Sequence, residues 1–180
     1  MGIDLTLVVG GDHGPLRTYL LDGTKAETYD AYGYCISVVC SKTGNVIAAA
    51  FPTGLIKVYF VLGSEKASDL DAEFVHDGRY FFKYHLWVDV SSIALSDDEQ
   101  YLVAASSSRV QVFDMITREV YTSFKVHREG ELLPVCISSR SKYIALNLNS
   151  WTIGVFGVEK GERFRVIEDP RRGIYNPLFC

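Results

Sequence analysis

Short apolar or alternating segments, broken by turn residues, recur along the whole chain. Leu5 to Val9 is apolar and ends at Gly10-Gly11, whereas Ile56 to Val61 alternates between apolar and polar residues. Alternation with a period of two is the pattern of a strand that buries one face. Asp22-Gly23 is a dipeptide typical of a hairpin turn. The pattern therefore predicts many short strands joined by tight turns.

Helical periodicity is nearly absent from the chain. The best helical candidate, Ser64 to Glu73, is short and polar. Turn signals recur about every ten residues, which is typical of a β-sandwich, a β-barrel or a β-propeller. The sequence therefore predicts an all-β fold class.

An internal repeat favours one of these architectures. Residues 35–61, 91–115 and 134–158 share one order: an apolar strand, a serine, a polar turn, a second apolar strand and an alternating third strand. An earlier partial copy places Tyr19 at the aromatic position of the third strand, and a fourth strand is expected after each third one. The repeat is carried by aligned serines and aligned aromatic residues, which are Ser41, Ser96, Ser138, Tyr59, Phe113 and Phe156.

Four-stranded units that recur about every 40 to 45 residues resemble the blades of WD (tryptophan–aspartate) repeat β-propellers. The terminal Trp-Asp pair of that family corresponds to Phe113-Asp114, Tyr59-Phe60 and Phe156-Gly157, of which only the first keeps the acid. The Gly-His step of the family has no clear copy, although His127 lies near its expected place. The resemblance implies an array of about four four-stranded antiparallel blades that forms an open or partial ring.

The expected blades divide the chain into one domain and a tail. They cover residues 4–30, 34–76, 88–127 and 133–168, with an insertion at 62–86, so the WD-repeat-like domain spans 1–168 and the tail spans 169–180. Propellers of this family usually close with about seven blades, and an open arc leaves apolar faces and unpaired edges at its ends. We therefore expect a piece of a larger propeller, or closure by self-association or by a second propeller-completing chain.

The amino-acid composition argues against nucleic-acid and membrane partners. Of the 180 residues, 48% are hydrophobic and 22% are charged, which is typical of a globular protein. A net charge of −4 gives no basic excess, so we expect no nucleic-acid partner. No long apolar run and no basic leader is visible, so we expect no membrane partner and a cytoplasmic location, with a nuclear or ciliary location as the alternatives.

The polar residues show no pattern typical of a metal site or of catalysis. The four cysteines form no C-x-x-C pair and are expected to be free thiols in a reducing compartment. Asp69, Asp71 and Glu73 begin like a calcium loop, but the glycine and the final acid of such a loop are missing. No Gly-x-Ser-x-Gly elbow occurs. We therefore predict no metal, no cofactor and no catalytic residue.

A propeller without such signatures is expected to be a non-catalytic protein–protein interaction scaffold within a larger complex, and not an enzyme. The alternatives are a structural cilium- or microtubule-associated propeller subunit, the substrate-receptor propeller of a ubiquitin-ligase complex, and a propeller-based hydrolase. Partners are expected to be other proteins. The aromatic cluster around the end of the insertion (Tyr80, Phe81, Phe82, Tyr84 and Trp87) could bind a partner or pack on a blade, and the tail has the same two interpretations. Candidate partner-binding residues in loops, insert and tail are His13, Arg17, Thr53, Tyr80, Phe82, Tyr84, Trp87, Arg109, Trp151, Tyr175 and Phe179.

Overall fold

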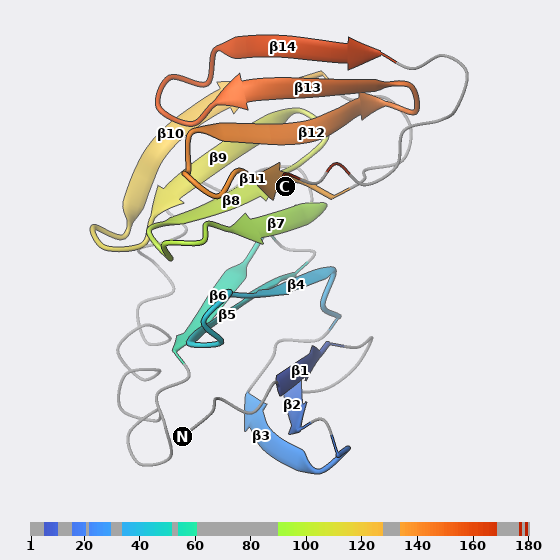
Figure 1. Cartoon of the computed structure of the whole chain (residues 1–180), viewed down its shortest axis with the longest axis vertical. Coiled ribbons are helices and arrows are strands. Elements are labelled where there is room, and N and C mark those ends of the chain that lie inside the picture. The colour runs from blue at the N-terminus through green and yellow to red at the C-terminus, as the bar shows by residue number, and fades with distance from the viewer. Residues whose placement is uncertain are drawn as a thin grey trace.

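Four antiparallel β-sheets follow one another along the long axis of the molecule (Figure 1). This computed structural model describes residues 6–10, 16–20, 22–29, 34–51, 54–60, 90–127, 134–168, 177 and 179. Within these ranges the chain forms fourteen strands and no helix. The expected all-β, antiparallel fold is therefore confirmed. None of the four described sheets closes on itself.

In every sheet the strands lie in chain order. The first two sheets have three described strands each, and the last two have four. The first sheet contains β1 (Thr6–Val9), β2 (Leu16–Leu20) and β3 (Lys25–Tyr29), and the second contains β4 (Ser37–Cys40), β5 (Val46–Ala50) and β6 (Ile56–Phe60). The third contains β7 (Ser92–Leu95), β8 (Tyr101–Ala105), β9 (Arg109–Asp114) and β10 (Glu119–Lys125), and the fourth contains β11 (Cys136–Ile137), β12 (Tyr143–Asn149), β13 (Thr152–Gly157) and β14 (Arg163–Glu168).

The aligned serines occupy the same turn in three sheets. Each follows a first strand, and its hydroxyl accepts a hydrogen bond from the backbone N–H that begins the second strand. These bonds run from Val46 to Ser41, from Tyr101 to Ser96 and from Tyr143 to Ser138, over 3.0, 2.9 and 3.1 Å. The third residue after each serine has a positive φ, and these residues are Gly44 (78°), Glu99 (58°) and Ser141 (54°). The structure therefore confirms the serine alignment predicted from the sequence.

The aligned aromatic residues of the third strands also share one position. Each is buried and lies opposite the second residue of the neighbouring second strand. The three pairs are Tyr59 with Ile47, Phe113 with Leu102 and Phe156 with Ile144. Each aromatic residue belongs to the apolar cluster that its sheet shares with the preceding sheet. This part of the repeat is confirmed too.

Tyr19 on β2 shares the position of these three aromatic residues. It lies opposite Leu7, the second residue of β1, as Phe113 lies opposite Leu102. The pairing of β2 with β3 has a register shift beside Tyr19, as the pairings of β9 with β10 and of β13 with β14 have beside Phe113 and Phe156. Both features agree with the predicted place of Tyr19 on a third strand, so β1 is the counterpart of a second strand.

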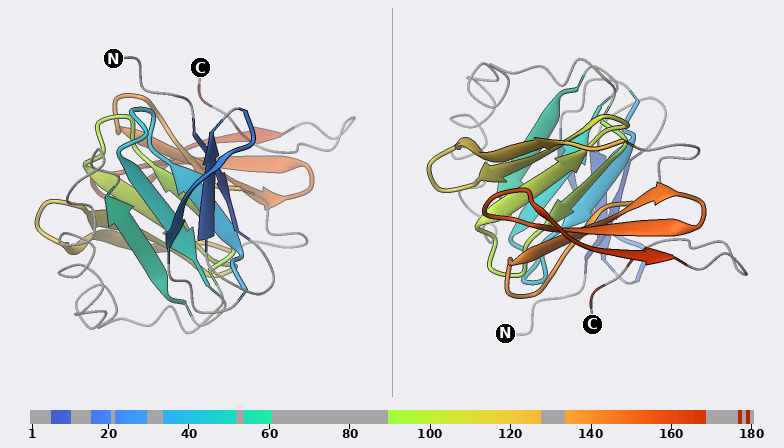
Figure 2. Two further views of the ribbon diagram at one scale, coloured as in Figure 1. Left: turned by 90° about the horizontal axis from the view of Figure 1, so that it is seen from below. Right: turned by 90° about the horizontal axis from the view of Figure 1, so that it is seen from above.

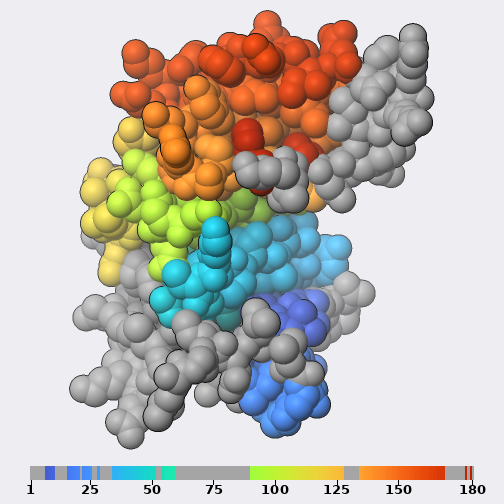
Figure 3. Space-filling view, in the orientation of Figure 1, coloured from blue at the N-terminus to red at the C-terminus, as the bar shows by residue number. Residues whose placement is uncertain are grey.

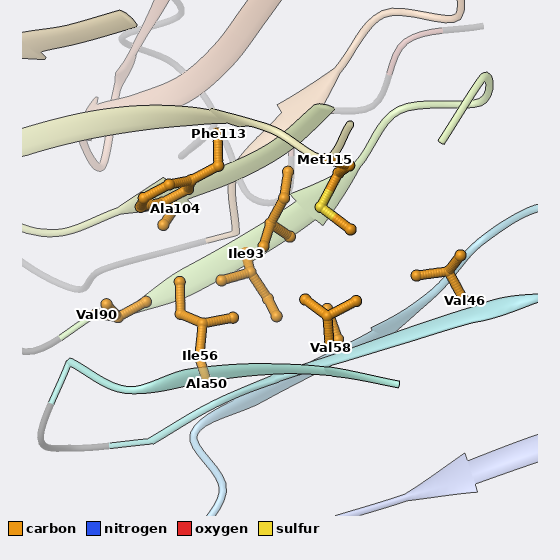
Figure 4. Packing of buried hydrophobic residues seen from close by; sticks show 11 residues of the cluster. Val46, Ala50, Ile56, Val58, Val90, Ile93, Ala104, Phe113 and Met115 are labelled. Atoms are coloured by element: carbon orange, nitrogen blue, oxygen red, sulfur yellow. The ribbon is translucent and has the colours of Figure 1, made fainter. Parts of the chain in front are cut away.

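Apolar side chains fill the space between each pair of neighbouring sheets. Figure 2 shows these sheets overlapping in two views along the long axis of the molecule. Figure 4 shows the middle cluster, where Ile56 and Val58 of the second sheet lie near Ile93 and Phe113 of the third. All five residues of β5 are buried, because both faces of this strand are covered. Burial of apolar surface contributes about 25 cal/mol per Å², so these clusters are the main source of stability.

The first described strand of each sheet contacts the first strand of the next sheet. β1 contacts β4, β4 contacts β7, and β7 contacts β11. The hydroxyl of Ser37, the first residue of β4, accepts a hydrogen bond from the N–H of Ile93 over 3.4 Å. The hydroxyl of Ser92, the first residue of β7, accepts one from the N–H of Val135 over 3.0 Å. The same bond thus recurs between consecutive sheets, which keep the same orientation.

Candidate interaction surface

The turns between first and second strands form a continuous rim, here called the first-turn rim (residues 41–45, 96–100 and 138–142). Lys42 Nζ lies 3.3 Å from Asp97 Oδ2, and the hydroxyl of Thr43 donates to Glu99, so the second and third sheets are joined there. The hydroxyl of Ser141 donates to Asp98 over 3.1 Å and joins the third sheet to the fourth.

Asp98 is the most heavily hydrogen-bonded carboxylate of the first-turn rim. Partial burial raises its pKa, but hydrogen bonds from the Ser96 hydroxyl, the Gln100 N–H and the Ser141 hydroxyl outweigh this effect. The pKa of Asp98 therefore lies below its ordinary value. The carboxylate is ionised at neutral pH, and its oxygens are engaged in joining turns of two sheets.

The opposite ends of the sheets carry an exposed tryptophan and an exposed arginine. Second strands run away from the first-turn rim, so the turns that follow them lie at the other end of each sheet. We call these turns, around Gly54 and at residues 106–109 and 149–151, the second-turn rim. Trp151 is 49% exposed, and its backbone N–H donates to Asn149 Oδ1 over 2.9 Å. Arg109 is also exposed.

Hydrogen bonds shape the turn that presents Arg109. The hydroxyl of the buried Ser106 accepts bonds from the N–H groups of Ser108 and Arg109, over 3.3 and 3.1 Å. The guanidinium Nη1 of Arg109 donates to the hydroxyl of Ser123 over 3.1 Å. The side chain is thus held along the sheet while the residue remains exposed. Arginine and tryptophan are the residues most enriched at the energetic centres of protein interfaces.

The structure brings only some of the predicted partner-binding residues together. Arg109 and Trp151 lie on the second-turn rim in neighbouring sheets, whereas Arg17 is exposed on β2 of the first sheet. Phe179 is half-buried, and its backbone forms a hydrogen bond with the Cys136 thiol. At Phe179 the tail thus lies against the last sheet, as its second interpretation expected. Outside the described residues lie His13, Thr53, Tyr80, Phe82, Tyr84, Trp87 and Tyr175.

Sequence reasoning did not identify the exposed apolar residues of the two end sheets. Leu7 and Val9 of β1 are 59% and 42% exposed, and Phe164 and Ile167 of β14 are 60% and 47% exposed. The expectation of apolar faces at the ends of an open array is met by these residues. Residues 163–168 read as an ordinary outer strand in the sequence, because the same alternation occurs in strands whose apolar face is covered.

The described cysteines are protonated thiols. Cys35, Cys40 and Cys136 are free, and burial raises the pKa of each. A thiol with a raised pKa is a poor nucleophile at neutral pH. In the ranges that the structure describes, no group of three or more His, Cys, Asp or Glu side chains is arranged to hold a metal ion.

Comparison with known proteins does not assign the chain to a family. No protein-family model matches the chain, and no curated protein matches it either. The WD-repeat resemblance therefore rests on the internal repeat. A search of the described residues for a helix long and apolar enough to cross a membrane finds none.

Proposed function

We propose that the chain is a non-catalytic protein-interaction scaffold, built from WD-like β-propeller blades and acting as a subunit of a larger complex. Three features support the identification of the sheets as blades. Each sheet is a meander, its first described strand contacts the first strand of the next sheet, and each aligned third-strand aromatic residue packs against the preceding sheet. Propeller blades are arranged in this way around a central axis.

The observation that carries the proposal is the pair of exposed side chains on the second-turn rim. Trp151 and Arg109 lie in corresponding turns of neighbouring sheets, and both turns are fixed by side-chain hydrogen bonds to the backbone. A rigid turn that presents tryptophan loses little conformational entropy when a partner binds. The chemistry fits a protein partner with an apolar pocket for the indole and a carboxylate for the guanidinium.

Two kinds of side chain that often act in catalysis, a carboxylate and the thiols, are poorly suited to it in this fold. The oxygens of Asp98 accept hydrogen bonds that join two sheets, and the described thiols are protonated. These arrangements support a scaffold in preference to a hydrolase.

Affinity capture with quantitative mass spectrometry tests the proposal. The wild-type chain is expected to retain at least one protein at a stoichiometric level from an extract of its source cells. Trp151→Ala and Arg109→Ala should each weaken the retention of that protein by about five- to thirty-fold, because truncating a central interface residue costs about 1–2 kcal/mol.

Ile116→Ala is the matched control. Ile116 is 73% exposed, and its neighbour Met115 donates a backbone hydrogen bond to Gln100, so Ile116 lies beside the first-turn rim. Its truncation should leave retention unchanged. If the wild-type chain retains no protein stoichiometrically, or if all three variants retain it equally, the second-turn rim is not the interaction surface.

A further inference from the structure

β14 is the outer strand of the last sheet, and all six of its residues are exposed (Figure 3). One edge pairs with β13, and no described strand pairs with the other edge. Such an edge presents backbone N–H and C=O groups to a further strand. The corresponding strand of the third sheet, β10, alternates between exposed and half-buried residues instead, because Phe124 stacks on Phe156 of the fourth sheet.

A β-bulge determines which side chains of β14 share a face. Arg165 lies opposite Val155, but Arg163 lies opposite the next residue, Phe156, so Phe164 is the additional residue of the bulge. Directly opposite residues share a face, and consecutive residues of β13 point to opposite faces. Arg163 and Arg165 therefore lie on opposite faces of the sheet, although a regular strand would place them on the same face.

The bulge divides the six residues into two sets. One face carries Arg163, Val166 and Glu168, each of which lies opposite an alternate residue of β13. The other face carries Phe164, Arg165 and Ile167. Phe164 belongs to this second face because its ring contacts the ring of Tyr143, with centroids 4.9 Å apart, and Tyr143 shares the face of Val155.

We propose that β14 pairs in antiparallel orientation with β14 of a second copy of this chain, about a two-fold axis at Val166. On one face, Glu168 then lies beside Arg163 of the second copy, and the two Val166 side chains are in contact. On the other face, Ile167 lies opposite Arg165 of the second copy, and the bulge residue Phe164 of that copy follows next to this pair. A two-fold axis normal to the sheet requires that facing residues share a face, and the Arg163–Glu168 pair meets this requirement because of the bulge.

Charge favours a second copy over an unrelated strand. The self-pairing forms two Arg163–Glu168 ion pairs, and it leaves no like charges directly opposite on either face, because Arg165 lies opposite the uncharged Ile167. A uniformly acidic or basic strand would oppose either Glu168 or Arg163 with a like charge, which is destabilising. β10 also has opposite charges at its ends, Glu119 and Lys125, but its apolar side chains are partly covered within the fold.

Sedimentation equilibrium of the 180-residue chain tests this pairing at concentrations up to about 200 μM, because an interface below about 1,200 Å² is expected to be weak. A monomer–dimer equilibrium is expected. Arg163→Glu and Glu168→Arg should each raise the dimer dissociation constant at least tenfold, since each creates two like-charge pairs. When these two variants are mixed in equal amounts, every facing pair is again of opposite charge, so a heterodimer of wild-type affinity should form.

Charge reversal on β10 provides the control. Lys125→Glu and Glu119→Arg change exposed residues of the other outer strand and should leave the dissociation constant unchanged. Near-ultraviolet circular dichroism verifies that each variant is folded. A monomer at all concentrations overturns the proposal, and so does a dimer that both β14 variants leave intact or that mixing fails to restore.

This inference goes beyond the scaffold function and does not depend on it. Trp151→Ala leaves β14 unchanged, so loss of partner capture by that variant leaves the dimer to be measured separately. Conversely, a chain that stays monomeric and still captures a partner through Trp151 overturns the pairing of β14 alone.

Discussion

The hydroxyl of Ser92 accepts a hydrogen bond from the backbone N–H of Val135 over 3.0 Å, across 43 residues of sequence. Both residues are 4% exposed. The equivalent bond from Ile93 to Ser37 links the preceding pair of sheets over 3.4 Å. A serine at the start of a first strand thus fixes the next sheet in place, so the order of the sheets depends on specific polar contacts as well as on the apolar clusters.

Ser92→Ala should lower the free energy of unfolding by about 1–2 kcal/mol, because it leaves the buried N–H of Val135 without its acceptor. Ser37→Ala should cost less, since its hydrogen bond is longer. Urea unfolding of both variants measures the two losses. An equal loss for the two variants, or no loss for Ser92→Ala, would show that these bonds do not help to hold the sheets together.

Gly161 lies in the turn between β13 and β14, with φ of 66°. A Cβ built on it would lie 2.4 Å from Phe124 Cδ1, and Phe124 stacks on Phe156 with ring centroids 5.1 Å apart. Gly161→Ala should therefore cost about 2–4 kcal/mol, from the left-handed backbone together with overpacking.

Gly23→Ala separates these two contributions. Gly23 has φ of 85°, and apart from its chain neighbours no atom of the described residues lies within 4 Å of a Cβ added there. Only the backbone effect applies there, so the loss should be about 1 kcal/mol. Thermal unfolding of both variants compares the two positions. Equal losses would mean that Phe124 moves aside at little cost.

The sequence repeat predicted the turns and the aromatic positions because these depend on local hydrogen bonds and on one buried face. Ser96 and Phe113 illustrate this, since each recurs wherever the same contact is made. Tyr19 follows the same rule, since it lies opposite Leu7 as Phe113 lies opposite Leu102.

The faces of β14 were beyond sequence reasoning for a different reason. Arg163 and Arg165 are two residues apart, so period-two alternation assigns them to one face. The bulge at Phe164 reverses this assignment, and it arises from the pairing of β14 with β13. Turn position likewise predicted that Arg109 and Trp151 are exposed, and both are. The exposure of Phe164 and Ile167 was not predicted, because it depends on which sheets are neighbours in space.

Asp98 should make stability depend on pH. Its pKa is lower in the folded chain than the ordinary value of 3.8, so the carboxylate stabilises the fold above pH 3.8. This contribution is lost as the pH falls below 3.8 and through the lowered pKa. Asp98→Asn should therefore be less stable than the wild type at pH 7, and the difference should shrink below pH 3.8. Urea midpoints across this range provide the measurement, and a pH-independent difference would contradict the assignment.

Gln111 on β9 is 4% exposed and lies opposite Ala104, which belongs to the cluster between the second and third sheets. Within the described part of the chain, no group donates a hydrogen bond to its Oε1. An unpaired buried amide oxygen costs about 1–3 kcal/mol, so Gln111→Leu, which keeps a similar volume, should raise the free energy of unfolding by about 1 kcal/mol.

Ser106→Ala is the control for Gln111→Leu, because it also removes a buried polar group but one that accepts two hydrogen bonds. It should lower the free energy of unfolding by about 1–2 kcal/mol. Removing a buried polar group is thus expected to raise the free energy of unfolding where the polar atom is unpaired and to lower it where the atom is hydrogen-bonded. Urea unfolding of both variants decides the matter. A loss of stability in Gln111→Leu would mean that the amide makes a favourable contact that a leucine side chain does not replace.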